Sequence, residues 1–356
     1  MPRLGRPFLA LSTTAVSLLA LAGCGSSGGD ASADGTPAAG GPASLAGQSV
    51  TVYSGQHEQT VKALTADFEK RTGISVKLRS GDEAELANQI LQEGPASPAD
   101  VFYAENPPAL TVVEEKNLLA PVAPGTLKSV PAADSSPQGG WVGVSARTAA
   151  FVTHLGTAAD SAPPASVRDL ATPAWKGRLG IAPAETDFAP IVTRMIKTDG
   201  TDGAKKWLQG LKANAKVYNS NEDLSVAVNS GEVQGGVVDH YYWYRLRDEK
   251  TAAGTHSKLH YFTKGDPGAL VDISGAGILK SSKHQAAAQA FLAYLDGKDA
   301  QQLIAGSQSY EYPLLSGVPG KAELTPLDTI GTVVPVADLG DGKAALQLLQ
   351  DTGLLQ

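Results

Sequence analysis

Short apolar runs alternate with segments of helical periodicity from residue 48 onward. The run SVTVYS has the β-branched character of a strand. After it, Val61, Leu64 and Phe68 fall on one face of a helix, which is expected to end at Gly73. A strand, a helix and a nearly continuous apolar strand follow in ISVKLR, EAELANQILQEG and ADVFYA. This βαβαβ pattern predicts an α/β fold with a largely parallel sheet.

The second half of the chain repeats the alternation. Its strands and helices are predicted in GRLGIA, AKKWLQGLKA, EDLSVAVNSGE and QGGVVD. With about 310 residues available for ordered structure, two α/β halves predict two domains.

Polar side chains follow the predicted strands at their carboxyl ends, where ligands bind in open α/β sheets. The first strand leads to His57, the third to Glu105, and QGGVVD leads to Tyr241 and Tyr242. Within a strand the two phenols would point to opposite faces. In the first turn of a helix, neighbours are only about 100° apart, so both oxygens can reach one ligand. The alternative is that the tyrosine pair only packs in the core.

The N-terminus has the pattern of an export signal in residues 1–23. Arg3 and Arg6 precede an apolar stretch too short to span a bilayer comfortably, and small residues lead to Cys24. The segment LAGC resembles the lipobox of bacterial lipoproteins, in which the cysteine carries lipid; the alternative is an ordinary secretory signal. Residues 24–47 are rich in Gly, Ser, Ala and Pro and predict a disordered tether. We therefore expect a lipid anchor at Cys24, on the extracytoplasmic face of the cell membrane.

The charge balance excludes some partners. Once Arg3 and Arg6 are removed with the signal, 36 acidic residues stand against 27 basic ones. Such a chain is not suited to nucleic acid or to anionic lipid surfaces, whereas it is compatible with a cationic ligand. No later apolar run is long enough to cross a membrane.

The order and spacing of several segments resemble the bacterial ferric-ion-binding proteins, which are transferrin-like substrate-binding proteins of ABC transporters. The resemblance covers nearly all of residues 48–356 and rests on TVYSGQHEQ, SPADVFYAEN, PAWKGRLGIAP, VVDHYYWYRLRDEK and GDPGALVDISGAGILKSS. It implies a type II periplasmic binding protein fold, with a ligand cleft between two domains joined by crossover strands. The implied domains are discontinuous: 48–147 with 272–322, and 148–271 with 323–356.

The resemblance also implies a ligand set and partners. His57 and Glu105 from the first domain, with Tyr241 and Tyr242 from the second, correspond to the ligands of a transported Fe3+ ion. A monomer would deliver this ion to an ABC transporter permease. The chemistry agrees, because ferric ion is a hard acid that prefers anionic oxygen. Direct coordination can deprotonate a phenol well below its free pKa of about 10.

The chain departs from its relatives where a synergistic anion would bind. Arg147 and Asn221 match positions that contact the anion in the family. Phosphate-binding relatives have a Ser-Gly-Ala turn where this chain has APAETDF, which contains Glu185, Thr186 and Asp187. Because two carboxylates would repel phosphate, we expect carbonate, water or a carboxylate of the protein to complete the metal shell. The alternative is that Glu185 or Asp187 only caps the following helix.

Two polar residues, Asp239 and His240, precede the tyrosine pair directly. They are candidates for orienting the phenols from behind, and the alternative is that they pack or face solvent. Tyr244 lies one step off the pair and is expected in the core.

The two alternatives are a binding protein for another solute and a metal-dependent enzyme. Clefts of the same fold bind thiamine, phosphonates or oxyanions through aromatic stacking or backbone donors, and the predicted ligand set argues against these solutes. A metal-dependent hydrolase or oxygenase would need a motif such as H-E-x-x-H or a nucleophile elbow, and the sequence has neither. The sequence therefore predicts a binding protein without catalytic residues.

Overall fold

The structure, a computed structural model, describes residues 45–355. The predicted signal peptide, Cys24 and residues 24–44 of the predicted tether lie outside the described residues. Residues 45–47 lead into the first strand through a turn, in which the Gly47 N–H donates to the Gly73 carbonyl over 2.8 Å. Leu45 packs against apolar side chains of the core. These three residues, whose composition predicts part of the tether, therefore belong to the folded part of the chain.

A mixed sheet organises the fold, with its strands in the order β2-β1-β3-β10-β5-β8-β6-β7. β1 pairs in parallel with β2 and β3, and β6 pairs in parallel with β7 and β8. β5 and β10 are antiparallel to each other, while β4 and β12 join β10, and β9 and β11 join β5. The strands are β1 Ser49–Ser54, β2 Ser75–Ser80, β3 Val101–Ala104, β4 Leu119–Ala120, β5 Trp141–His154, β6 Leu179–Ile181, β7 Ala215–Val217, β8 Gly235–Asp239, β9 Ser257–His260, β10 Leu270–Leu279, β11 Tyr312–Pro313 and β12 Thr332–Val333.

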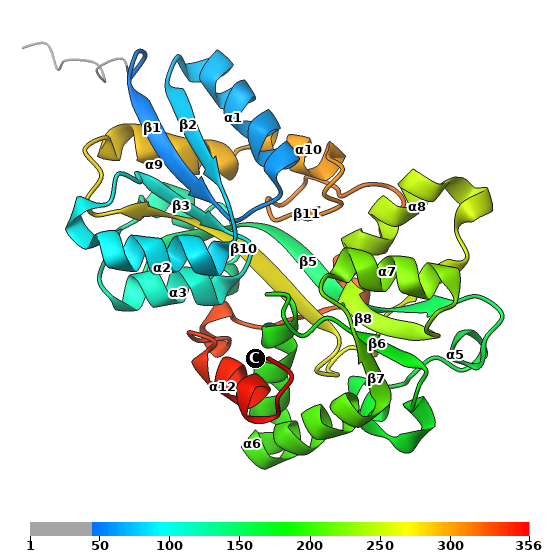
Figure 1. Cartoon of the computed structure of the whole chain (residues 1–356). Coiled ribbons are helices and arrows are strands. Elements are labelled where there is room, and N and C mark those ends of the chain that lie inside the picture. The colour runs from blue at the N-terminus through cyan, green and yellow to red at the C-terminus, as the bar shows by residue number, and fades with distance from the viewer. Residues whose placement is uncertain (1–44, 356) are drawn as a thin grey trace, which may run out of the picture. The chain divides into compact units, whose positions relative to one another are not determined.

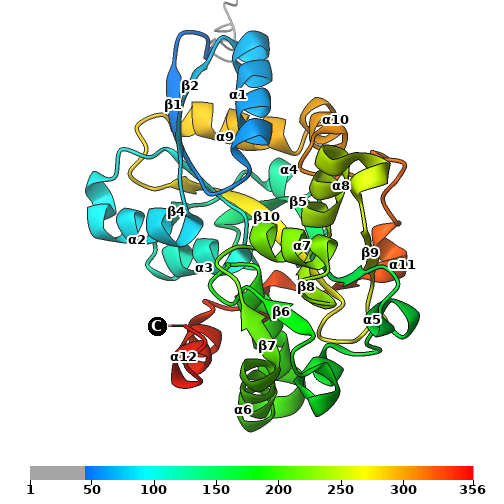
Figure 2. The same ribbon diagram turned by 45° about the vertical axis from the view of Figure 1, so that its right-hand side comes forward.

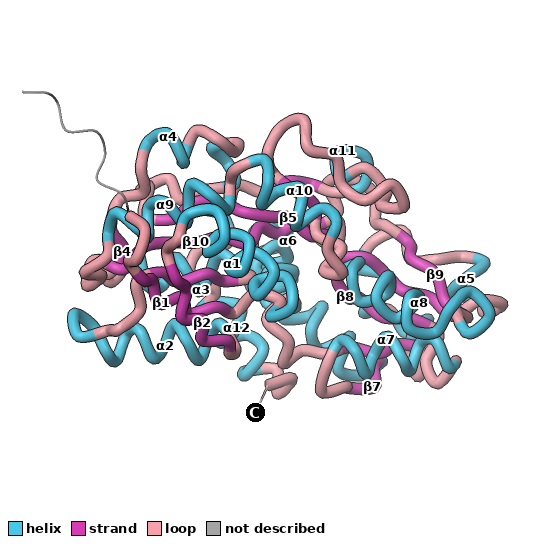
Figure 3. The backbone as a smooth tube through the Cα atoms, turned by 90° about the horizontal axis from the view of Figure 1, so that it is seen from above, coloured by secondary structure: helices cyan, strands magenta, loops and turns pink. Residues whose placement is uncertain are grey.

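Helices lie on both sides of the strands (Figure 3). Within residues 45–355, no helix has both the length and the apolar character needed to cross a membrane. The α-helices are α1 Glu58–Thr72, α2 Glu83–Glu93, α3 Pro107–Glu115, α4 Pro124–Leu127, α5 Ala158–Ser161, α6 Phe188–Asn214, α7 Asn221–Ser230, α8 His240–Gly254, α9 Gln285–Leu295, α10 Lys298–Gly306, α11 Leu327–Ile330 and α12 Lys343–Asp351. Short 3-10 helices are η1 Gly94–Ala96, η2 Ala132–Asp134, η3 Val167–Ala171, η4 Pro173–Trp175 and η5 Val336–Asp338.

Two long buried strands, β5 and β10, run between the part of the molecule that holds β1–β3 and the part that holds β6–β8 (Figures 1 and 2). Residues 141–148 of β5 pair with β10, and residues 149–153 pair with β8. The predicted domain boundaries after residues 147 and 271 fall inside these two strands. The boundaries themselves stay a prediction.

The strands and helices predicted from periodicity are confirmed. Residues that typically begin or end a helix stand at the ends of several of the helices. α1 ends at Gly73 and α7 at Gly231, and both glycines adopt the left-handed conformation typical of a helix C-terminus. α2 and α7 begin with side-chain caps from Asp82 and Ser220, which accept backbone N–H groups of the first turn.

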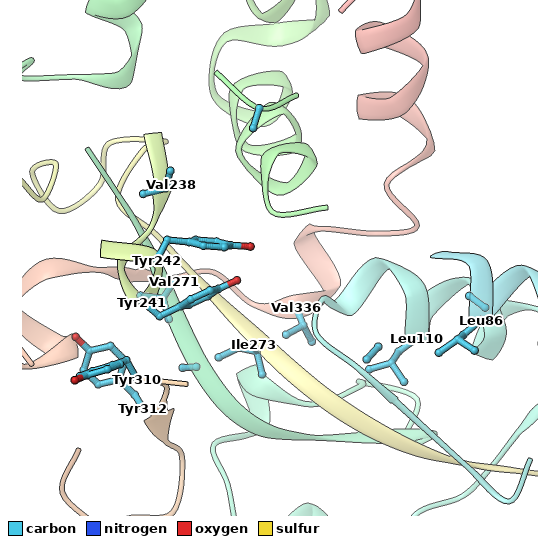
Figure 4. Close-up of a cluster of buried hydrophobic side chains, with 14 of the residues drawn as sticks. Leu86, Leu110, Val238, Tyr241, Tyr242, Val271, Ile273, Tyr310, Tyr312 and Val336 are labelled. Carbon is cyan, nitrogen blue, oxygen red and sulfur yellow. The ribbon is translucent and has the colours of Figure 1, made fainter. Parts of the chain in front are cut away.

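Three apolar clusters hold the layers together. One packs α1 and α9 on the first strands and includes Phe68, and a second joins α6 and α12 through residues such as Trp207 and Leu348. The third lies between them and contains Tyr241 and Tyr242 (Figure 4). The rings of the tyrosine pair are therefore part of the apolar core, whereas packing does not account for the position of their hydroxyl groups.

Candidate metal site

His57 and Glu105 follow the carboxyl ends of two neighbouring parallel strands. β1 ends shortly before His57, and Glu105 comes directly after β3. Because the strands pair in parallel, their ends meet at one edge, and His57 Nε2 lies 3.4 Å from Glu105 Oε1. The turn before His57 requires a glycine, since a Cβ on Gly55 would stand 2.4 Å from the Cβ of Glu83. The sequence prediction that these two groups converge is confirmed.

Tyr241 and Tyr242 occupy the first turn of α8, as the geometry of adjacent phenols requires. Their ring centroids are 4.3 Å apart, and both hydroxyls point the same way (Figure 4). The Tyr241 hydroxyl donates to Glu105 Oε1 over 3.0 Å, and its ring meets the His57 ring edge-on at 4.7 Å between centroids. The structure thus brings all four predicted ligands together.

Asp187 lies against both phenols. Its Oδ2 accepts hydrogen bonds from the hydroxyls of Tyr241 and Tyr242, over 3.2 and 3.3 Å. The Asn221 side-chain amide donates to the same oxygen over 3.4 Å. Asp187 stands at the N-terminal cap position of α6 but makes no side-chain capping hydrogen bond there. The capping alternative is therefore wrong for Asp187, whose carboxylate accepts from the two phenols instead.

The two residues before Asp187 have other partners. Glu185 Oε1 accepts the backbone N–H of Asn221 over 3.1 Å, so it caps α7 and not the helix that directly follows it. The Thr186 hydroxyl accepts from the Asn106 side chain over 3.3 Å. Asn106 lies next to Glu105, so this bond joins the β3 edge to the β6 edge.

Arg147 is fully buried at the centre of an acidic group. Its Nε lies 3.1 Å from Asp239 Oδ2 and 3.7 Å from Asp187 Oδ1, and its Nη2 lies 3.8 Å from Asp272 Oδ2. Nη2 also donates to the Asn106 side-chain oxygen. The positive charge of the guanidinium therefore balances part of the negative charge of the surrounding carboxylates. It also connects the end of β8, which precedes the tyrosine pair, to the loop after β3.

Burial and neighbouring negative charges favour the protonated forms of Glu105, Tyr241 and Tyr242. Desolvation, followed by the charge of Asp187, raises the pKa of Glu105 to about 8. Burial first, and then the carboxylates of Asp187 and Glu105, raise the pKa values of Tyr241 and Tyr242 well above the usual tyrosine value. Burial lowers the pKa of His57, so its imidazole is neutral and able to coordinate. A cation that enters must displace the protons on the phenols and on Glu105.

Two acidic side chains near the site were not found from the sequence. Glu311 is fully buried and accepts hydrogen bonds from Gln56 Nε2 over 3.1 Å and from the Ser145 hydroxyl over 3.0 Å. Glu83 accepts from the backbone and side chain of Asn106, and burial raises its pKa to about 8. The only sequence signal for Glu311 is one acid inside the run SYEYPLL.

His240 and Tyr244 support the tyrosine helix from behind. His240 is fully buried, with Nδ1 accepting from the Thr148 N–H over 3.3 Å and Nε2 lying 2.8 Å from the Tyr310 carbonyl. Burial lowers the pKa of His240 to about 4, in keeping with a neutral ring that fastens α8 to β5. The Tyr244 hydroxyl donates to the Glu323 carbonyl over 2.9 Å, so its placement in the core is confirmed.

Known proteins are similar to this chain in both sequence and fold. The family model of bacterial extracellular solute-binding proteins matches residues 50–307. A Fe(3+)-binding periplasmic protein of Serratia marcescens is 40% identical over 318 residues, 89% of this chain and 94% of that protein. The major ferric iron-binding protein of Neisseria meningitidis serogroup B is 36% identical over 311 residues, 86% of this chain and 93% of that protein. The crystal structure of iron-bound HitA from Pseudomonas aeruginosa superposes on this chain with a TM-score of 0.82 at 40% identity, and the match covers 86% of this chain and 99% of that one. This similarity confirms the predicted two-domain type II fold.

Proposed function

The chain belongs to the bacterial extracellular solute-binding proteins, and from that premise we propose that it captures ferric ion and delivers it to the permease of an ABC importer. The observation that carries the proposal is the meeting of four oxygens. Tyr241 donates to Glu105 and Asp187, and Tyr242 donates to the same oxygen of Asp187. A single ion that replaces these protons would bind all four oxygens, with His57 beside them.

The donor set suits a hard trivalent ion. Two phenolates and the Glu105 carboxylate neutralise three positive charges, and neutral His57 adds a nitrogen. Its Nε2 is buried and has no hydrogen-bond partner among residues 45–355, as expected for an atom that awaits a ligand. We propose Asp187 as the fifth ligand, in the place that relatives give to an exogenous anion, and carbonate or water in the remaining position.

Anionic solutes fit this cleft poorly. Glu105, Asp187 and Glu311 all lie at the site, whereas Arg147 already contacts Asp239 and Asp272. A phosphonate or other oxyanion would meet more carboxylate than free cationic charge. A cation gains from the same arrangement, since each added positive charge relieves repulsion among the acids.

Closure would follow from the division of the ligands between the predicted domains. His57 and Glu105 lie at the β1 and β3 edge, and the tyrosine pair follows β8. Each predicted domain alone supplies only half of the ligands. The ion therefore stabilises the closed form, because only in that form can it contact the ligands of both domains. We propose that the permease recognises the closed form of a monomer, which is held at the cell membrane by lipid on Cys24 and by the tether.

Ferric titration of the metal-free protein tests this function and the role of Asp187 together. In buffer without phosphate or carbonate, the wild-type protein should take up one ferric ion from a weak chelator and develop a phenolate-to-iron absorption band. Asp187→Asn should need added bicarbonate for comparable affinity, while Glu185→Gln, its matched control, should not. Absence of any band would contradict the ferric function. A tight phosphate requirement in the wild-type protein would contradict the role given to Asp187.

A further inference from the structure

One buried carboxylate at the site, Glu311, has no part in the proposed ferric shell. It directly precedes β11, which pairs with residues Ser145 and Ala146 of β5. Its side chain is fully enclosed. Burying a carboxylate costs free energy unless it is paired or coordinates an ion, so its position calls for an explanation.

Glu311 lies within reach of two ligands of the ferric site. One ligand atom each from His57, Glu105 and Glu311 lie within 4.8 Å of one another. The distance from His57 Nε2 to Glu105 Oε1 is 3.4 Å. That matches the edge of a tetrahedron, about 3.4 Å, around an ion with ligands at about 2.1 Å. The Glu311 oxygen lies within 4.8 Å of both atoms, so it would have to approach them by at most about 1.4 Å to complete the same tetrahedral face.

The surrounding hydrogen bonds hold the triad in place. Gln56 donates from Nε2 to Glu311 Oε1 over 3.1 Å, and its own Oε1 accepts the backbone N–H of His57 over 2.7 Å. Ser145 donates to the other oxygen of Glu311 over 3.0 Å. Each carboxylate oxygen has two lone pairs, so one hydrogen bond leaves room for a metal bond.

We propose that His57, Glu105 and Glu311 form a second coordination set, which binds a divalent first-row transition ion without the tyrosines. One imidazole and two carboxylates are ligands that such ions accept, and the two carboxylates neutralise a charge of two. Water fills the remaining positions. This set shares His57 and Glu105 with the proposed ferric site but does not depend on ferric binding.

The three residues belong to one predicted domain, which gives the triad a distinct property. Residues 57 and 105 fall in segment 48–147, and residue 311 falls in segment 272–322. The triad is therefore complete in the open form, whereas the ferric shell needs closure. A divalent ion bound there would compete with ferric ion for His57 and Glu105.

Cobalt(II) is the probe, since its visible absorption reports both binding and coordination number. A Tyr241→Phe/Tyr242→Phe double variant removes the phenolates and keeps the triad. It should bind one Co2+ ion per chain, and adding Glu311→Gln should weaken that binding by about tenfold or more. Asp296→Asn in the same background, which removes a buried carboxylate at the end of α9, should leave the Co2+ affinity unchanged.

Each outcome decides the proposal. If the double variant does not bind Co2+, or if Glu311→Gln leaves its affinity unchanged, the triad is wrong. Thermal melting without metal identifies a variant that fails to fold, and Glu105→Gln then serves as the second test of the triad. If the wild-type protein shows no phenolate-to-iron band but Co2+ binding still depends on Glu311, the ferric function is wrong and the triad stands.

Discussion

Acid should release the ferric ion steeply, because three of the proposed ligands hold protons in the metal-free protein. The pKa values of Tyr241 and Tyr242 lie well above the usual tyrosine value, and that of Glu105 is raised to about 8. Below about pH 8, ferric binding therefore releases three protons, and the association constant falls about a thousandfold for each pH unit, or about 4 kcal/mol.

The sign and the shape of this dependence are both testable. The raised pKa values place the protons on the free protein, so affinity rises with pH. Above about pH 8 Glu105 is already ionised, and the slope should drop from three protons to two. Competition with a chelator of known proton dependence, at intervals from pH 5 to pH 9, measures the slope. Glu105→Gln should give a slope of two throughout. A wild-type slope of one or zero would refute the assignment of both phenols as ligands.

Three further changes test other parts of the structure. Cys24→Ser should release the protein from the membrane fraction or block its processing, and a wholly soluble wild-type protein would contradict the lipid anchor. Asp296→Asn should stabilise the protein most at pH 9 and less toward pH 4 in urea unfolding. Burial raises the pKa of Asp296 to about 8, so its ionisation costs the folded state up to about 6 kcal/mol. An equal effect at both pH values would argue against a protonated Asp296. Gly55→Ala should destabilise the fold by about 1–3 kcal/mol, since its Cβ would overlap Glu83, and an unchanged urea midpoint would show that the loop adjusts freely.

The sequence predicted those features that depend on neighbours along the chain. The strand ends at His57 and Glu105 follow from periodicity, and the first-turn position of Tyr241 and Tyr242 follows from the buried run before them. The resemblance to a family then supplied the metal. The predicted strand ends and the first-turn position of the tyrosine pair are confirmed, because each depends on one strand and the turn after it.

What the sequence could not predict depends on contacts between distant segments. Glu311 reaches His57 only because β11 pairs with β5, a short pairing over a long separation that leaves no periodic signal. Asp272 meets Arg147 because β10 and β5 align in one register. The APAETDF turn showed that Asp187 was unusual, but its direction toward the phenols depends on how α6 begins.

The most direct test of the central claim compares single phenylalanine substitutions in α8 by the phenolate-to-iron absorption band. Tyr241→Phe and Tyr242→Phe each remove one oxygen and keep the ring that packs in the core. Each should weaken ferric binding and diminish the band while the protein remains folded. Tyr244→Phe, whose hydroxyl donates to the Glu323 carbonyl and not to a predicted ligand, should keep the full band. Loss of the band in Tyr244→Phe with retention in the other two, or full retention in all three, would contradict the assignment of the tyrosine pair as the metal clamp.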